Sequence, residues 1–200
     1  MATTTARRRL DPLVRRDLIL DVAARTVAEE GVSAVSMERL GRDAGISKAL
    51  VYNYFPNRNA LLSELLVREY RVFQGEARQA KEGIDDFPTL VRVTTRAYLR
   101  HVAARGVLIQ RLMNEPAVSA AIRSVDQEGR QLTVAFFASE IAKFHGLDLK
   151  VSAMAADLLM GLTGAAGDYL CRTGAQIEEL EDVVVGMIMA ALAQLPAKGA

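Results

Sequence analysis

The sequence contains few of the residues that metal sites, disulfides and membrane spans require. It has one cysteine, Cys171, and two histidines, so an intrachain disulfide and a Cys- or His-rich metal site are excluded. The longest apolar run, residues 183–193, is far shorter than the ~20 residues that cross a bilayer. The first nine residues end in three arginines with no apolar segment behind them, unlike a secretory signal. We therefore expect a cytoplasmic protein with no metal, no cofactor and no membrane partner.

The motifs of common enzymes are also missing. The chain has no nucleophile elbow, P-loop, dinucleotide fingerprint or metal-ligand spacing. Cys171 has no histidine close to it in the sequence. We predict that the protein is not an enzyme. Half of its 200 residues are hydrophobic and 24% are charged, which is typical of a packed soluble protein.

Charge is distributed unevenly along the chain. The formal net charge is +1, yet residues 1–16 hold five arginines and one aspartate, and residues 72–200 carry a net charge of about −2. A basic arm on an otherwise neutral protein fits contact with a polyanion at one end. A disordered, solubilising tail is the alternative interpretation of this arm.

The pattern of prolines and apolar residues predicts an all-α fold. Each of the five prolines falls between stretches of helical periodicity, and no segment alternates as a strand would. We predict about nine helices, at about 12–30, 36–44, 48–55, 58–81, 88–104, 106–114, 117–145, 148–172 and 176–195.

Two of the short helices form a candidate helix-turn-helix over about residues 36–55. Their connection is Ala44-Gly45-Ile46-Ser47, in which Gly45 accepts the positive φ that the turn needs. Leu40, Val51 and Phe55 have the spacing of apolar anchors between the two helices. The second helix begins with small and polar residues that can approach DNA.

The string from Ser36 to Leu61 resembles the DNA-binding domain of the tetracycline-repressor (TetR) family. The resemblance rests on Ala44-Gly45-Ile46-Ser47, Val51-Tyr52-Asn53-Tyr54-Phe55 and Arg58-Asn59-Ala60-Leu61, and it covers about residues 13–65. It implies a basic flexible arm over residues 1–12, a helix-turn-helix DNA-binding domain over 13–75, and a helical ligand-binding and dimerisation domain over 76–200.

The resemblance also implies which residues contact DNA. They are Ser36, Lys48, Ala49, Leu50, Tyr52, Asn53, Tyr54 and Arg58. Ser36 and Arg58 are expected to anchor phosphates from helix N-termini. Lys48, Leu50 and Tyr54 are expected in the groove, and Tyr52 and Asn53 at phosphates. The sequence departs from the family at Leu50, which can make only apolar contact with a base, and at Gly41, where alanine is usual.

The second half is expected to dimerise and to bind a ligand. Interior glycines cost a helix ~1 kcal/mol each, so Gly161, Gly164 and Gly167 suggest close helix packing, either within one protomer or across a two-fold axis. The residues predicted for the dimer interface are Gly161, Gly164, Val184, Ile188 and Leu192. The residues predicted for the ligand pocket are Tyr70, Phe73, Tyr98, Met113, Phe137 and Met154.

Two further features of the second half receive a structural interpretation. Arg92, Arg96 and Arg100 recur every four residues, which is typical of a solvated helix face. His101 is expected to be a hydrogen-bonded core residue rather than a ligand contact.

The sequence therefore predicts a ligand-responsive, sequence-specific transcriptional regulator. The expected form is a homodimeric repressor that binds an inverted-repeat, double-stranded DNA operator and is released by a small, mostly apolar effector. The alternative is a helical interaction protein that has the same fold but no specific DNA binding.

Overall fold

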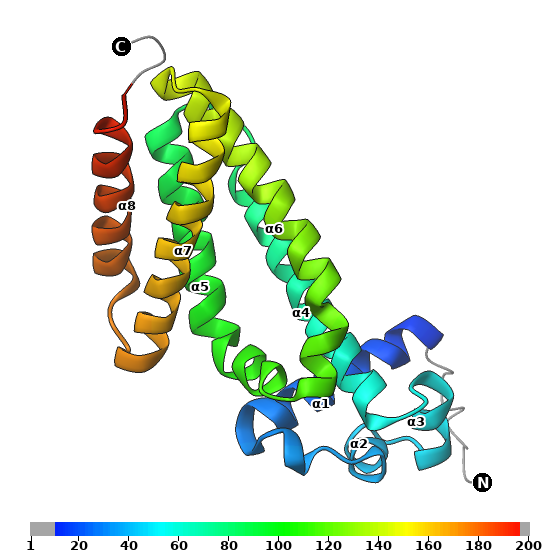
Figure 1. Cartoon of the computed structure of the whole chain (residues 1–200). Helices are drawn as coiled ribbons and strands as arrows, with labels where there is room; N and C mark the ends of the chain where they lie inside the picture. The colour runs from blue at the N-terminus through cyan, green and yellow to red at the C-terminus, as the bar shows by residue number, and fades with distance from the viewer. Residues whose placement is uncertain (1–10, 197–200) are drawn as a thin grey trace, which may run out of the picture. The chain divides into compact units, whose positions relative to one another are not determined.

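A computed structural model describes residues 11–196, apart from the side chains of residues 124–126. Over that range the chain forms helices and no strand, which confirms the all-α prediction. The elements are α1 (Pro12–Glu30), the 3₁₀ helix η1 (Val32–Ala34), α2 (Met37–Asp43), α3 (Lys48–Tyr54), α4 (Arg58–Ala80), α5 (Phe87–Met113), α6 (Pro116–His145), α7 (Leu149–Thr173) and α8 (Ile177–Ala193) (Figure 1). Most of the basic arm, residues 1–10, lies outside the described residues.

Two details differ from the predicted helices. Helix α5 continues through Gly106, where the sequence predicts a break. A Cβ at Gly106 would lie 2.9 Å from Cys171 Sγ, so this glycine allows close approach of α7 rather than ending a helix. The short helix η1 is an addition, and it follows Gly31, whose φ of 93° ends α1.

The chain divides into two compact units. One unit holds the residues up to Leu66 together with Gln110–Ala120, and the other holds Val67–Ile109 together with the residues from Ala121 onward. Helices α4, α5 and α6 each contribute residues to both units. The boundaries at residues 12 and 75 that the sequence suggests stay a prediction.

The core of the first unit forms around α1. Asp11 caps this helix, because its Oδ1 accepts a hydrogen bond of 2.8 Å from Leu13 N. Ile19 and Val27 are fully buried on its inner face. At the other end, Arg111 Nη1 donates to Val27 O over 2.7 Å and to Ala28 O over 2.9 Å. Val27 O also accepts a hydrogen bond from Gly31 N over 3.0 Å, so Arg111 adds a side-chain donor to the carbonyls of the last turn.

Helices α7 and α8 of the second unit run side by side in opposite directions (Figure 1). Gly174 makes this reversal possible with a left-handed φ of 66°. Gly167 is buried, and a Cβ there would lie 2.7 Å from the Tyr98 hydroxyl. The close packing that the glycines predict therefore exists at Gly167, within one protomer.

A buried carboxylate lies on the side of α8 that faces α5. Glu181 is fully buried and accepts hydrogen bonds from Arg96 Nε over 2.6 Å and from Arg92 Nη1 over 2.8 Å. Burial alone would raise the pKa of Glu181, but the bonds from Arg96 and Arg92 outweigh it and lower that pKa. The expected solvated arginine stripe holds only in part. Arg100 is exposed, and Arg92 and Arg96 are partly exposed, but the last two also neutralise a core carboxylate.

Candidate nucleic-acid interface

The turn between α2 and α3 is tight, and two glycines shape it. Gly45 has a left-handed φ of 66°. The next residue, Ile46, donates from its backbone N to Gly41 O over 2.8 Å. A Cβ at Gly41 would lie 3.0 Å from Ile46 O and 3.2 Å from Lys48 N. Gly41, which departs from the family pattern, therefore lets the turn lie directly against α2.

Each helix of the motif, and α4 after it, begins at a side-chain cap. Ser36 Oγ accepts a hydrogen bond of 3.2 Å from Arg39 N at the start of α2. Ser47 Oγ accepts one of 3.2 Å from Leu50 N at the start of α3. Asn57 Oδ1 accepts one of 2.8 Å from Ala60 N at the start of α4. Because the Ser36 hydroxyl accepts in its cap and is exposed, its own proton stays available for a phosphate oxygen.

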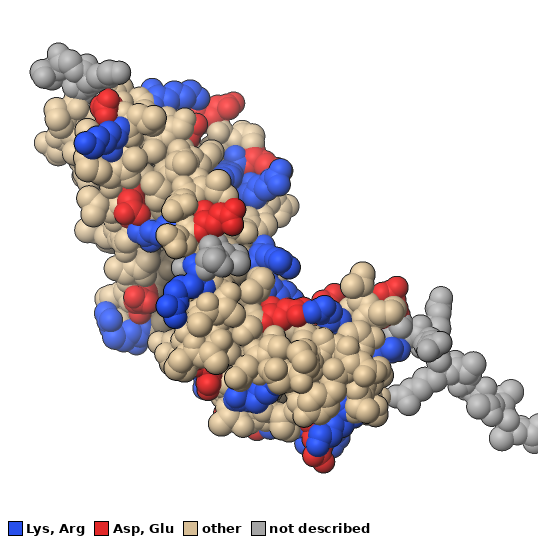
Figure 2. Space-filling view, turned by 45° about the vertical axis from the view of Figure 1, so that its right-hand side comes forward, with Lys and Arg blue, Asp and Glu red and all other residues tan. Residues whose placement is uncertain are grey.

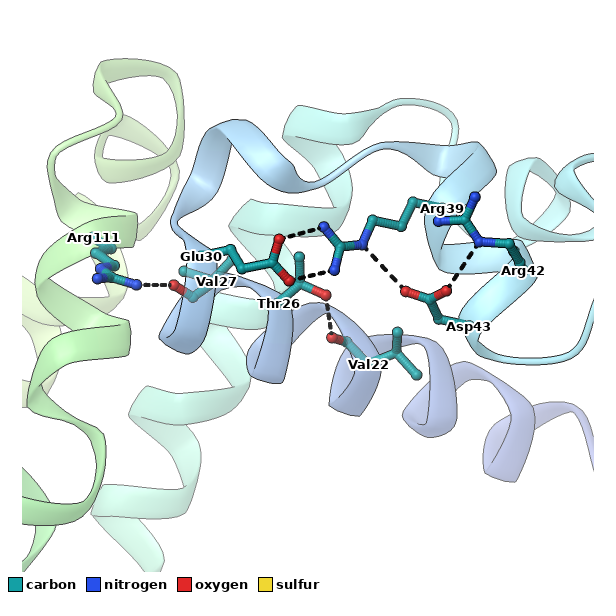
Figure 3. A network of polar contacts seen from close by, with 8 residues as sticks. All are labelled: Val22, Thr26, Val27, Glu30, Arg39, Arg42, Asp43 and Arg111. Carbon is teal, nitrogen blue, oxygen red and sulfur yellow. Dashed lines mark hydrogen bonds and ion pairs between the residues drawn. The ribbon is translucent and has the colours of Figure 1, made fainter.

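A network of charges holds α2 against the end of α1 (Figure 3). The Arg39 guanidinium donates two parallel bonds to the Glu30 carboxylate, of which Nη1 to Oε2 measures 2.8 Å. Its Nε donates to Asp43 Oδ2 over 3.2 Å, and Arg42 Nε reaches the other Asp43 oxygen over 3.3 Å. The bond from Arg39 lowers the pKa of Glu30. This bidentate geometry fixes the angle at which α2 leaves α1.

Helix α3 has one buried and one exposed face. Val51 is fully buried, as are Phe55 just after the helix and Leu40 on α2. The α3 residues predicted to contact DNA occupy the six other positions around the helix, and the Tyr54 hydroxyl lies 3.5 Å from Arg15 Nη1. Lys48, Ala49, Tyr52 and Asn53 are exposed, while Leu50 and Tyr54 are half-buried. The arrangement leaves a continuous helical surface of small, aromatic and polar side chains, of the kind that can enter a major groove.

Positive charge on this surface is sparse. Lys48 Nζ lies 3.6 Å from Glu38 Oε2, and both side chains are mostly exposed. Exposed pairs of this kind are weak, so a phosphate or a base could replace Glu38 as the partner of Lys48. On the face of the molecule in Figure 2, Lys and Arg side chains lie among Asp and Glu side chains rather than in one large basic area.

Arg58 does more than the anchoring role that the sequence suggests. Its Nε donates to Val35 O over 3.1 Å, and its Nη2 donates to Val32 O over 2.6 Å. The guanidinium thus ties α4 to the segment that leads into Ser36. Arg16 has a comparable structural role, since it pairs with Glu64 and lies 5.1 Å from the centre of the Phe55 ring. Sequence reasoning missed the role of Arg16, because Glu64 is 48 residues away in the chain. It also missed the role of Arg39, although the i,i+4 spacing of Arg39 and Asp43 is a local signal for an ion pair.

The residues predicted for a ligand pocket do not all come together. The Phe73 ring lies 5.8 Å from the Tyr98 ring and 5.0 Å from the His101 ring in the second unit. Tyr70 is half-buried in the same unit, and its hydroxyl occupies the space that a Cβ at Gly129 would fill.

Phe137 packs against the core of that unit. Two of the other predicted residues need correction. Met113 belongs to the first compact unit and is largely exposed, and Met154 is 53% exposed on the outside of α7. Neither side chain points into the interior of the second unit.

The residues predicted for the dimer interface also need correction. Val184, Ile188 and Leu192 are buried in the core of their own protomer, so they are not available to a partner. A Cβ added at Gly161 or at Gly164 would meet no atom within 4 Å, so no packing within the protomer requires a glycine there.

The exposed apolar side chains of α7 and α8 lie on other faces of these helices. They are Leu149, Met154, Leu158, Tyr169, Val183 and Met187. Among the described residues, α7 is the one helix whose length and hydropathy would suit a membrane span, and only 22% of its most apolar window is buried. This helix therefore presents an uncovered apolar surface.

Comparisons with known proteins place the helix-turn-helix in a family. Residues 19–65 match the profile described as "Bacterial regulatory proteins, tetR family". The regulator BetI of Rhizobium meliloti is 41% identical over 49 residues, which are 24% of each chain. The regulator LuxR of Vibrio harveyi is 34% identical over 67 residues, 34% of this chain and 33% of that protein. The chain thus spans about a quarter to a third of the length of these curated relatives.

Solved structures resemble the chain over a longer stretch. A TetR-like transcriptional regulator from Rhodococcus sp. RHA1 aligns with a TM-score of 0.74 at 21% identity, covering 94% of this chain and all of that one. The fatty acid degradation regulator FadR from Bacillus halodurans aligns with a TM-score of 0.71 at 18% identity, covering 96% and 100%. At these identities the likeness concerns the fold.

Proposed function

Because the chain belongs to the tetR family of bacterial regulatory proteins, we propose that it is a homodimeric transcriptional repressor. In this proposal it binds an inverted-repeat DNA operator in the cytoplasm and is released from it by a small effector. The observation that carries the proposal is the exposed face of α3, which is set by two capped helices and a glycine turn. Its task is binding, with no catalytic step.

We propose that α3 enters the major groove. Lys48, Leu50 and Tyr54 would face the bases, with Tyr52 and Asn53 at the phosphates and Ala49 allowing close approach. The Ser36 hydroxyl would donate to a phosphate. Arg58 would act mainly by positioning Ser36, since two of its donors already bond the backbone carbonyls before Ser36.

The apolar faces of α7 and α8 support the dimer. Leu158 is 75% exposed, and Gly161 and Gly164 leave open space beside it on α7. A second copy of these two helices would cover the surface in a two-fold, four-helix arrangement. Gly161 and Gly164, which no contact within the protomer requires, would allow the helices of the two protomers to approach closely. A two-fold dimer also matches an inverted-repeat operator, in which recognition helices reach successive major grooves ~34–36 Å apart.

Selection of bound sites from random duplex DNA tests this proposal. We expect an inverted repeat to be recovered by the wild type. Lys48→Ala should weaken binding to that site. If Lys48 reads a base, the loss should be ~1–3 kcal/mol and occur only with the selected sequence. If Lys48 contacts a phosphate, the loss should be the same for all sequences, and the affinity should depend less steeply on salt concentration.

Arg25→Ala is the matched control, since Arg25 is an exposed cation on α1, outside the helix-turn-helix. Removal of residues 1–9 should reduce affinity at low salt through lost counterion release. Failure to recover any sequence, with binding unchanged by Lys48→Ala, would favour a helical interaction protein without specific DNA binding.

A further inference from the structure

A cluster of polar and aromatic side chains lies between α4 and α5 in the second unit, with His101 and Glu69 buried and Glu76 and Arg105 about half exposed. From α4 it contains Glu69, Phe73 and Glu76, which lie on one face at helical spacing. From α5 it contains His101 and Arg105. Phe73 contacts His101 with ring centres 5.0 Å apart. This cluster belongs to neither the helix-turn-helix nor the exposed faces of α7 and α8.

Two acceptor atoms of this cluster lack a hydrogen bond. His101 is 6% exposed, and its Nε2 is buried with no hydrogen-bond partner among the described residues. Glu69 is 2% exposed, and its Oε2 likewise accepts no hydrogen bond within the described part of the chain. Arg105 Nε lies 3.6 Å from that oxygen, too far for a hydrogen bond. Buried polar atoms without a partner are costly, so each requires an explanation.

The chemistry of His101 follows from its other nitrogen. His101 Nδ1 lies 2.9 Å from Glu76 Oε2. An ionised carboxylate only accepts hydrogen bonds, so Nδ1 carries a hydrogen, and in the tautomer with a single ring hydrogen Nε2 is then an acceptor. Glu69 Oε2 is an acceptor for the same reason. Both unsatisfied atoms therefore require a donor from outside the described chain.

The charges near the two acceptors largely cancel. Glu69 pairs with Arg105 and with Arg68, whose Nη2 is 3.5 Å from Glu69 Oε1. A cationic ligand thus gains little from Glu69, while an anionic one would place its charge beside acceptor atoms. The neighbouring Phe73 and Tyr98 rings favour an apolar, aromatic body.

We propose that this cluster binds the polar end of the effector, and that the effector is a neutral, largely apolar molecule that donates a hydrogen bond from a hydroxyl group to His101 Nε2. The inference rests on the proposed function, since it assigns the chemistry of the effector. It also refines the sequence-based expectation of a mostly apolar ligand, because it adds one required polar group. Glu69 Oε2 is a second acceptor for the same or another hydroxyl.

Binding of three matched probes tests the proposal directly. The probes are 2-naphthol, naphthalene and 2-naphthoate, which share a ring system and differ only in the polar group. The chain contains no tryptophan, so naphthyl fluorescence can be followed without interference from indole emission. We expect 2-naphthol to bind the full chain about tenfold more tightly than naphthalene, the effect of one hydrogen bond to a buried acceptor.

Substitution at the two histidines separates this site from other apolar surfaces. His101→Phe keeps an aromatic ring and removes Nε2, so it should reduce the preference for 2-naphthol over naphthalene to about onefold. His145→Phe, the same change at the other histidine, should leave the preference intact. If His101→Phe fails to fold, the ¹⁵N chemical shift of His101 Nε2 in the wild type replaces it, and it should move with 2-naphthol and not with naphthalene.

Three outcomes would overturn the proposal. In the first, 2-naphthol and naphthalene bind equally tightly, or neither binds. In the second, 2-naphthoate binds more tightly than 2-naphthol. In the third, folded His101→Phe keeps the wild-type preference for 2-naphthol over naphthalene. None of these measurements involves DNA, so their failure leaves the proposed DNA-binding function standing. A chain that binds 2-naphthol as expected but no duplex DNA would overturn the proposed repressor and not this site.

Discussion

Met187 and Ile188 are adjacent on α8, and the same substitution at each should have opposite consequences. Met187 is 52% exposed on the proposed dimer face, whereas Ile188 is 6% exposed and packs in the core of its own protomer. We predict that Met187→Glu separates the two protomers while leaving them folded. Ile188→Glu should unfold the chain.

The magnitudes follow from burial. A fully buried Ile side chain contributes ~1.5–3 kcal/mol, and an uncompensated buried carboxylate costs several kcal/mol more. The total at Ile188 approaches the ~5–15 kcal/mol that holds a whole domain together. At Met187 only the exposed half of the side chain can be buried by a partner, which is ~1–1.5 kcal/mol for each protomer. Two-fold symmetry doubles this loss, so the dimer should weaken by about 30- to 150-fold before any cost of burying the carboxylate.

Sedimentation velocity over a dilution series, together with circular dichroism, measures both effects. Met187→Glu should show a helical chain that sediments as a monomer at concentrations where the wild type is a dimer. Gln194→Glu, another exposed position beyond the end of α8, is the matched control and should leave the dimer intact. A dimer of wild-type affinity in Met187→Glu, or a folded monomer in Ile188→Glu, would refute the assignment of these two faces.

Substitutions at Gly167, Glu181 and Arg58 test the packing within each unit. Gly167→Ala should lower the free energy of unfolding in urea by ~1–3 kcal/mol, because its Cβ would lie 2.7 Å from the Tyr98 hydroxyl. Gly75→Ala is the control: it has open space around it and should stabilise α4 by up to ~1 kcal/mol. Because the pKa of Glu181 is lowered below its ordinary value of 4.5, its ion pairs should stabilise the protein above that pH and be lost as the pH falls further. Glu181→Gln should make the free energy of unfolding depend less on pH in this acid range. An unchanged pH dependence would contradict the stabilising role of the ion pairs of Glu181 with Arg92 and Arg96. Arg58→Lys should lower the melting temperature almost as far as Arg58→Ala, since one ammonium cannot reproduce the fork that reaches both Val35 O and Val32 O; full rescue by lysine would contradict that role.

Helix boundaries could be predicted closely because the signals for them are local. Ser36, Ser47 and Asn57 each accept a hydrogen bond from a backbone N three residues downstream, and Gly31 and Gly174 end helices through their own φ angles. The motif is local as well, because its turn and both of its helices fit within about twenty residues. A single sequence is sufficient wherever the interacting groups are neighbours in the chain.

The sequence could not show which face of a helix meets which partner. The apolar stripe through Val184, Ile188 and Leu192 has the same spacing whether it packs inside a protomer or between two. Only the neighbouring core residues of other helices decide this. Likewise, Arg92 and Arg96 fit a solvated stripe until Glu181, 85 residues beyond Arg96, is placed between them. The partner that covers a helix face is determined by tertiary packing, whereas sequence periodicity predicts only that the helix has an apolar or charged face.

The arginines of the helix-turn-helix region show how structural and DNA-contacting charges are divided. Arg39 and Arg16 pair with carboxylates, and Arg58 and Arg111 donate to backbone carbonyls. Guanidinium groups engaged in this way hold the angle between helices, and moving them to phosphates would release the groups that they satisfy. The electrostatic part of DNA affinity would therefore come from cations with weak or exposed partners, such as Lys48, and from the basic arm. On this division, removing a positioning arginine lowers stability first and DNA affinity as a consequence, whereas removing Lys48 lowers affinity alone.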